Sequence, residues 1–243
     1  AGSTTLIGGQ NTAAVSDGYP NLFAPAGFTF AIWGVIYLLL GLFFFRMFEI
    51  WKPKKSQLNN HVLNQVIMLF AVSSVLNMVW LLSWQYQVFW LSVIIMVGLL
   101  VTLIKINTLL VDRQYDIKEW ALVRLPFSVY FGWITVATIA NIATWLLSFG
   151  WDGFGLSPAV WTVAMLIAGA VIIIATMWRN NDWTYGAVGV WAYAGILAKH
   201  LSEEGSNGRL PSLLAALYVI LPILIVFTVQ FAVKHLSTAL RKR

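Results

Sequence analysis

The sequence contains no cysteine, and few of its residues carry a charge. Without cysteine, the 243-residue chain has no disulfide, no thiolate nucleophile and no zinc–thiolate site. Only 10% of the residues are charged, whereas 60% are hydrophobic and the mean hydropathy is +0.79. A water-soluble globule of this composition would expose most of its apolar surface. The composition therefore predicts an integral membrane protein.

The residues that several kinds of catalysis and transport need are also missing. No charged side chain falls in the middle third of a predicted membrane span, which argues against ion pumps and proton-coupled carriers. Lys234 lies at the end of the last span, so no central lysine can form a retinal Schiff base. There is no glycine-rich phosphate loop, no His-Glu-x-x-His and no serine with a credible histidine and aspartate around it. An enzyme is therefore not the expected function.

The apolar residues that are present fall into seven blocks of about 20, the length that crosses roughly 30 Å of hydrocarbon as an α-helix. Lipid offers the backbone no hydrogen bonds, and the alternating pattern of a β-barrel is absent, so the blocks are predicted to be helices. The predicted spans are 28–49, 61–84, 87–110, 120–148, 157–178, 183–201 and 212–235. The predicted fold class is an all-α integral membrane protein with about seven transmembrane helices.

The positive charges alternate between the two sides of this arrangement. All of the 15 Lys and Arg residues except Lys199 and Arg209 fall in every second loop or in the C-terminal tail. The positive-inside rule then predicts an N-terminus outside and a cytoplasmic C-terminus. The basic tail is explained by topology and by attraction to lipid, so nucleic acid is not an expected partner. The chain begins with Ala1 and has no Lys or Arg before residue 28, which suggests that a preceding signal or helix was removed.

Aromatic and small polar side chains recur at helical spacing in three of the spans. Turned inward, such stripes would line a pocket with flat apolar walls and a few hydrogen-bonding groups, as a flat amphipathic ligand requires. The alternative interpretation is that the asparagines join helices by hydrogen bonds and the tryptophans only pack. The stripes are Thr29, Trp33 and Tyr37; Ser73, Asn77, Trp80 and Trp84; and Trp133, Ala137, Ala140, Asn141 and Thr144.

Three motifs on these spans resemble those of the TspO, or translocator-protein, family of tryptophan-rich sensory proteins. Residues 20–37 resemble that family's proline-containing loop and Trp-x-x-x-Tyr pair, here Trp33 and Tyr37. Leu76-Asn77-Met78-Val79-Trp80 resembles its Leu-Asn-x-x-Trp motif. Tyr130 and Trp133, followed by Asn141, resemble its Tyr-x-x-Trp…Asn pattern. Val129 and Ser73 depart from the family's usual proline and glutamine.

The resemblance implies a cavity enclosed by a helical bundle. Family members bind tetrapyrroles such as protoporphyrin and, in mitochondria, cholesterol, and they often dimerise. By resemblance, the ligand-binding residues here would be Trp33, Tyr37, Asn77, Trp80, Tyr130, Trp133, Ala137 and Asn141. The resemblance covers about residues 20–148 and lacks the family's first helix. It predicts an outer segment (1–27), a TspO-like bundle of four helices (28–148), and three additional helices with a basic tail (149–243).

The leading hypothesis is a membrane protein that binds a flat hydrophobic ligand, either a porphyrin or other tetrapyrrole or a sterol-like molecule. A structural hypothesis is an accessory or pigment-contacting subunit of a larger membrane complex, because the three extra helices offer surface for other subunits. A third is an enzyme that oxidises its tetrapyrrole. The expected partners are the lipid bilayer, a small hydrophobic ligand, and either a second copy or other membrane subunits.

Overall fold

The computed structural model describes residues 9, 11–47, 60–111, 113, 115–203 and 205–240, and this part of the chain forms helices and no strand. The all-α fold class is therefore confirmed. The helices, of which η1 and η3 are 3-10 and η2 is a π-helical turn, are α1 (Thr12–Asp17), η1 (Gly27–Ala31), α2 (Ile32–Met47), α3 (Asn60–Gln85), α4 (Phe89–Leu110), α5 (Ile117–Glu119), η2 (Trp120–Arg124), α6 (Leu125–Ser148), η3 (Gly153–Gly155), α7 (Pro158–Asn180), α8 (Trp183–Leu201) and α9 (Pro211–Leu240).

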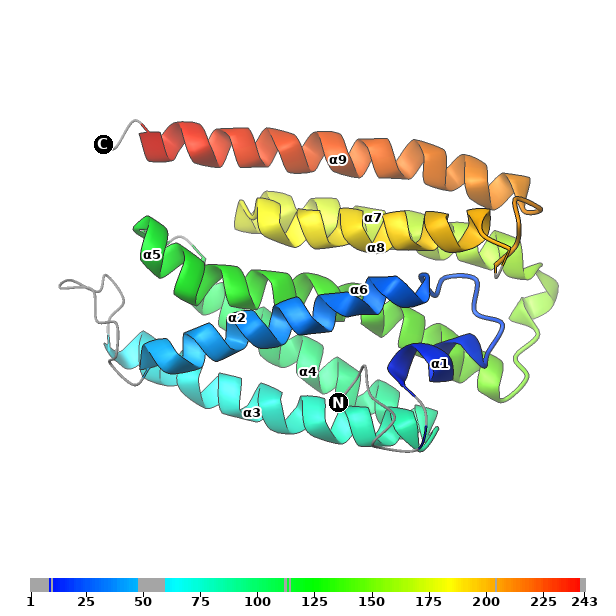
Figure 1. The fold of residues 1–243 in the computed structure, drawn as a ribbon, viewed down its shortest axis with the longest axis horizontal. Coiled ribbons are helices and arrows are strands. Elements are labelled where there is room, and N and C mark those ends of the chain that lie inside the picture. Colours follow the sequence, from blue (N-terminus) through cyan, green and yellow to red (C-terminus); the bar gives the residue numbers. More distant parts are fainter. Residues whose placement is uncertain are drawn as a thin grey trace.

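The long helices lie side by side, with α3 and α4 at one edge and α9 at the other (Figure 1). Between them α4 packs on α6, α6 on α8, and both α7 and α8 on α9. The continuous segment Ile117–Ser148 is the interior of the molecule, with 78% of its most apolar stretch buried. In the other candidate spans, only 28–39% of the most apolar stretch is buried inside the protein. Their exposed residues are large and apolar, as contact with lipid requires.

Six helices of the described chain are long and apolar enough to cross a membrane, which supports an integral membrane location. They correspond to six of the seven predicted spans. The seventh, 183–201, is a helix with the predicted bounds but is not among the six. This helix, α8, packs against α6, α7 and α9, so much of its surface faces protein, where apolarity toward lipid is not required. Residues 48–49, the predicted end of the first span, lie outside the described residues.

The segment that precedes η1 folds back over one end of the bundle. Asn11 caps α1 by accepting a hydrogen bond from the Ala14 N–H at 2.8 Å. The Asn21 amide donates to the Thr144 hydroxyl of α6 at 3.0 Å, and the Lys199 ammonium of α8 lies 2.7 Å from the Asp17 carboxylate. These contacts hold α1 at the end of the molecule where α6 leads into α7 (Figure 1).

The crossing of α6 and α8 depends on Gly132, and we predict that Gly132→Ala destabilises the protein by about 1–3 kcal/mol. A Cβ there would lie 2.9 Å from the Val188 Cβ and 3.1 Å from the Tyr185 carbonyl oxygen, neither of which is the end of a flexible side chain. The matched control is Gly98→Ala in α4, where the nearest atom, on Leu76, is 3.9 Å away. Because alanine favours a helix over glycine, the control should be neutral or stabilising. Unfolding in mixed detergent, followed by circular dichroism, measures both; equal stability of the two variants would contradict the prediction.

Candidate functional site

Aromatic rings from α2, α3 and α6 meet around Trp33. The Trp33 ring is stacked on Tyr37 and on Trp80, each at 5.5 Å between centroids, with interplanar angles of 24° and 27°. Tyr130 and Trp133 approach the same indole edge-on, at 6.2 and 6.3 Å. These are the two favoured geometries of aromatic pairs. We call these five residues the aromatic cluster.

The helical spacing noted in the sequence explains how the aromatic cluster forms. Trp33 and Tyr37 are four residues apart in α2, so their side chains lie one above the other on a single face. Trp80 and Trp84 have the same spacing in α3 and are stacked at 6.1 Å. Trp33, Trp80, Tyr130 and Trp133 are at most 5% exposed, whereas Tyr37 is 40% exposed at the margin. The rings of three spans thus turn inward and not toward lipid.

The two predicted asparagines differ in what they do. The Asn77 amide donates to the Tyr37 hydroxyl at 3.2 Å, and its own carbonyl oxygen, although buried, has no hydrogen-bond partner. Asn141 exchanges hydrogen bonds with Ser92 of α4 at 2.7 and 3.1 Å. Asn141 therefore joins α6 to α4 by hydrogen bonds, which is the role that the alternative interpretation gave to the asparagines. Asn77 instead lies at the edge of the aromatic cluster.

A small cavity of about 30 Å³ lies against the aromatic cluster, with α1 forming one wall. It has room for about one water molecule. The indole N–H groups of Trp80 and Trp133 are buried without a hydrogen-bond partner, whereas that of Trp84 donates to the Thr12 carbonyl at 3.2 Å. The lining residues are Thr12, Ser16, Pro25, Phe30, Trp33, Trp80, Trp84, Trp133, Val136, Ala137, Ala140 and Asn141.

This arrangement brings all eight predicted ligand-binding residues to one region. Seven of them belong to the aromatic cluster or line its cavity, and the eighth, Asn77, bonds to Tyr37. Flat walls and two unsatisfied donors match the chemistry of a flat apolar body that carries hydrogen-bond acceptors, although a cavity of about 30 Å³ would have to widen to admit one. The unsatisfied donors cost about 1–3 kcal/mol each, so any acceptor placed there is favoured.

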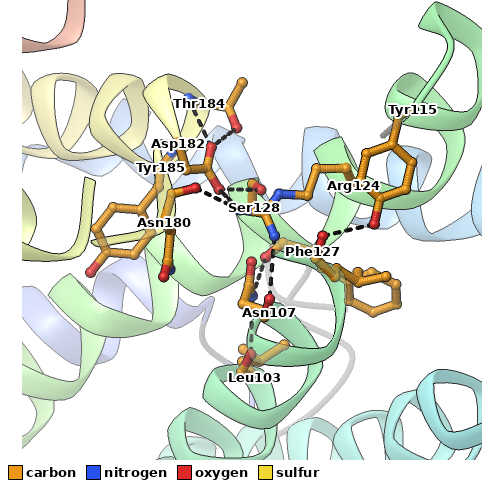
Figure 2. Close-up of polar contacts among 11 residues, drawn as sticks. Leu103, Asn107, Tyr115, Arg124, Phe127, Ser128, Asn180, Asp182, Thr184 and Tyr185 are labelled. Carbon is orange, nitrogen blue, oxygen red and sulfur yellow. Dashed lines mark hydrogen bonds and ion pairs between the residues drawn. The ribbon is translucent and has the colours of Figure 1, made fainter. Parts of the chain in front are cut away.

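A second buried polar group lies at the other end of α6 (Figure 2). The Arg124 guanidinium is 3.1 Å from the Asp182 carboxylate, and both side chains are at least nine-tenths buried. The same guanidinium donates to the carbonyl oxygens of Asn107 and Asn180 at 3.3 and 3.4 Å. The Ser128 hydroxyl donates to Asp182 as well, at 2.5 Å. We call Asn107, Arg124, Ser128, Asn180 and Asp182 the polar joint, because it connects α4, η2, α6, α7 and α8.

The polar joint also sets local structure. Asp182 caps α8 by accepting from the backbone N–H groups of Thr184 and Tyr185 and from the Thr184 hydroxyl, the last at 2.6 Å. Nearby, burial raises the pKa of Tyr115 to about 12, and the Tyr115 hydroxyl donates to the Leu110 carbonyl (Figure 2).

The sequence analysis counted Arg124 only as a loop charge and did not single out Asp182. An aspartate directly before a helix start was the available signal.

Comparison with known proteins gives one match. A protein-family model described as "TSPO-like protein" matches residues 1–230. Of the three long helices after residue 148, predicted as additions to the family's bundle, α7 and α8 fall inside the matched range and α9 is matched up to residue 230. No curated protein and no solved structure matches.

Proposed function

Because the chain belongs to the TSPO-like protein family, we propose that it binds a flat hydrophobic ligand, a porphyrin or another tetrapyrrole, among the rings of the aromatic cluster. The observation that carries the proposal is the convergence of Trp33, Trp80 and Trp133, from three helices, on one cavity, together with the buried indole N–H groups of Trp80 and Trp133, which have no hydrogen-bond partner. A sterol-like molecule would share the burial but would stack less well, because it has no flat conjugated ring system.

Binding would combine burial, stacking and hydrogen bonding. Each aromatic pair formed with the ligand contributes roughly 0.5–1.5 kcal/mol beyond burial. The indole N–H groups of Trp80 and Trp133 would donate to carboxylate or carbonyl oxygens at the ligand's edge, and hydrogen bonds to a charged acceptor are about twice as strong as neutral ones. Asn77, whose carbonyl oxygen lacks a partner, would accept from a ring N–H or a hydroxyl.

Entry of such a ligand requires α1 to move. The cavity of about 30 Å³ is far below the roughly 300–1,000 Å³ of small-molecule sites. The side-chain contacts that hold α1 and the residues after it include the Trp84 indole on the Thr12 carbonyl, the Asn21 amide on the Thr144 hydroxyl, the Asp17–Lys199 pair, and the Tyr19 hydroxyl on the Gln87 side chain at 3.0 Å. Of these, the exposed Asp17–Lys199 and Tyr19–Gln87 contacts contribute about 0–1 kcal/mol each, so the burial gained on binding must offset mainly the buried contacts of Thr12 and Asn21.

Titration of the purified protein with protoporphyrin tests the proposal. We expect saturable quenching of tryptophan fluorescence together with a shifted porphyrin absorbance band, because the ligand would lie against several indoles. A sterol added in excess distinguishes the ligand classes: it should displace the porphyrin poorly if stacking dominates. Absence of saturable binding by any planar tetrapyrrole would overturn the proposal, and preferential sterol binding would replace the ligand class.

A further inference from the structure

A second, larger cavity lies on the opposite face of α6 from the aromatic cluster. Its volume is about 470 Å³, within the roughly 300–1,000 Å³ range of small-molecule sites. Ala137 and Asn141 face the first cavity, whereas Ile139, Ala143 and Leu146 line the second, as expected for positions about half a helical turn apart. The two cavities share no lining residue.

The cavity forms because α6 and α7 meet at one level and separate toward their connected ends. At the meeting point, a Cβ on Gly169 would lie 3.3 Å from the Ile139 side chain and 2.6 Å from the Tyr193 hydroxyl. From Ile139 to Leu147 the helix rises about 12 Å, most of the hydrocarbon depth of one leaflet. The two helices thus bound a groove, closed at its deep end, and we call it the α6–α7 groove.

The walls and the mouth of the α6–α7 groove have different chemistry. Aliphatic side chains of α6 line its length, α7 contributes Thr162 and Met165, and Pro20–Leu22 cover one side. Trp151 and Trp161 contact each other at the mouth, 5.0 Å between centroids, and the Trp161 indole already donates to the Gly153 carbonyl. Tryptophan pairs of this kind favour the headgroup level of a bilayer. The mouth therefore lies where a lipid headgroup would sit.

The charge at the mouth is negative. Asp152 is exposed there, and its carboxylate accepts from the Phe154 N–H at 3.0 Å. Among the described residues, no Lys or Arg lines the groove. A headgroup with an ammonium is therefore favoured over one that is only anionic.

We propose that the α6–α7 groove binds one hydrocarbon chain of a membrane lipid whose headgroup carries an ammonium, such as phosphatidylethanolamine. The chain fills the apolar length of the groove, and the ammonium lies beside Asp152. The lipid belongs to the leaflet at the α1 end of the bundle, because the mouth opens beside Pro20–Leu22.

Native mass spectrometry of the protein released from nanodiscs tests this. With equal amounts of phosphatidylethanolamine and phosphatidylglycerol of matched chains, the parent should retain the ethanolamine lipid preferentially. Ala143→Phe places a ring in the groove and should reduce lipid retention by about tenfold, the effect of displacing two methylene groups. The matched control is Ala168→Phe, at an exposed position of α7, which should retain lipid as the parent does. Equal retention by the two variants overturns the proposal.

Asp152→Asn tests the preference for an ammonium headgroup and leaves the walls of the groove unchanged. Its result therefore holds even if Ala143→Phe fails to fold. It should reduce the preference for phosphatidylethanolamine over phosphatidylglycerol by about two- to fivefold, as an exposed charge pair does. A photoreactive phosphatidylethanolamine should also label peptides within 139–165. An unchanged preference in Asp152→Asn, or labelling spread evenly over the lipid-facing helices, would overturn the proposal. Protoporphyrin binding is measured on the same samples, so failure of one site is distinguishable from failure of the other.

Discussion

Arg124→Met should lower the free energy of unfolding by about 3–5 kcal/mol, because it leaves the buried Asp182 carboxylate without its partner. Both side chains of the pair are at least nine-tenths buried, so Asp182 is largely shielded from the solvent that could otherwise replace the guanidinium. The loss also removes the hydrogen bonds that Arg124 donates to the carbonyls of Asn107 and Asn180. Unfolding in mixed detergent micelles, followed by circular dichroism, measures the change.

The neighbouring chain provides a matched control and a double variant. Arg179→Met, at an exposed position near the end of α7, should change stability by no more than about 0.5 kcal/mol. Arg124→Met combined with Asp182→Asn should recover much of the loss, since the amide is uncharged yet still caps α8. If Arg124→Met were no more harmful than Arg179→Met, the polar joint would not be what holds α4, α6, α7 and α8 together.

The polar joint also shows where sequence reasoning reached its limit. Arg124 lies among other charged residues after the third predicted span, and that pattern is typical of a solvated loop. The structure places Arg124 in η2, inside the predicted span 120–148, with its side chain buried in the protein and not in a solvated loop. Its partner is 58 residues away in the chain. No local pattern specifies such a pairing, although the helix-capping position of Asp182 was visible.

The aromatic stripes were predictable for the opposite reason. Their information is local: residues four apart in a helix share a face whatever surrounds that helix. The prediction that Trp33, Trp80 and Trp133 meet was an inference from three such faces together with the family resemblance, and the ring distances agree with it. The small size of the cavity and the cover provided by α1 could not be predicted, because they depend on how a segment with little apolar periodicity docks onto three helices.

The bounds of the spans were predictable within a few residues, but the role of each span was not. α6 and α8 occupy the interior, while α2, α3, α7 and α9 present apolar side chains to lipid. In sequence, both kinds of helix appear as apolar blocks. The lower apolarity of α8, with its glycines and tyrosines, distinguishes a helix surrounded by protein from one that faces acyl chains.

The largest functional effect is expected from Trp33→Ala combined with Trp133→Ala. The double variant should bind protoporphyrin on the order of 100-fold more weakly, because two ring contacts of roughly 0.5–1.5 kcal/mol each are lost together with their buried area. Fluorescence of the bound porphyrin measures the affinity. The matched control is Trp90→Ala with Trp178→Ala, which removes two indoles that are 55% and 69% exposed and lie outside the aromatic cluster.

Removing two buried indoles also weakens the fold, by about 3–5 kcal/mol for each large-to-small change in a core. Trp133→Phe helps to separate binding from folding, since it keeps a six-membered ring in the cavity and removes the pyrrole part of the indole with its unpartnered N–H. Stability should fall by less than in Trp133→Ala, while porphyrin affinity falls about tenfold if that N–H donates to the ligand. Affinity in the double alanine variant equal to that of the parent, measured on protein shown to be folded, would place the ligand elsewhere. If Trp133→Phe bound porphyrin as tightly as the parent, Trp133 would contribute to binding only by stacking. The hydrogen bond to the ligand would then come from Trp80.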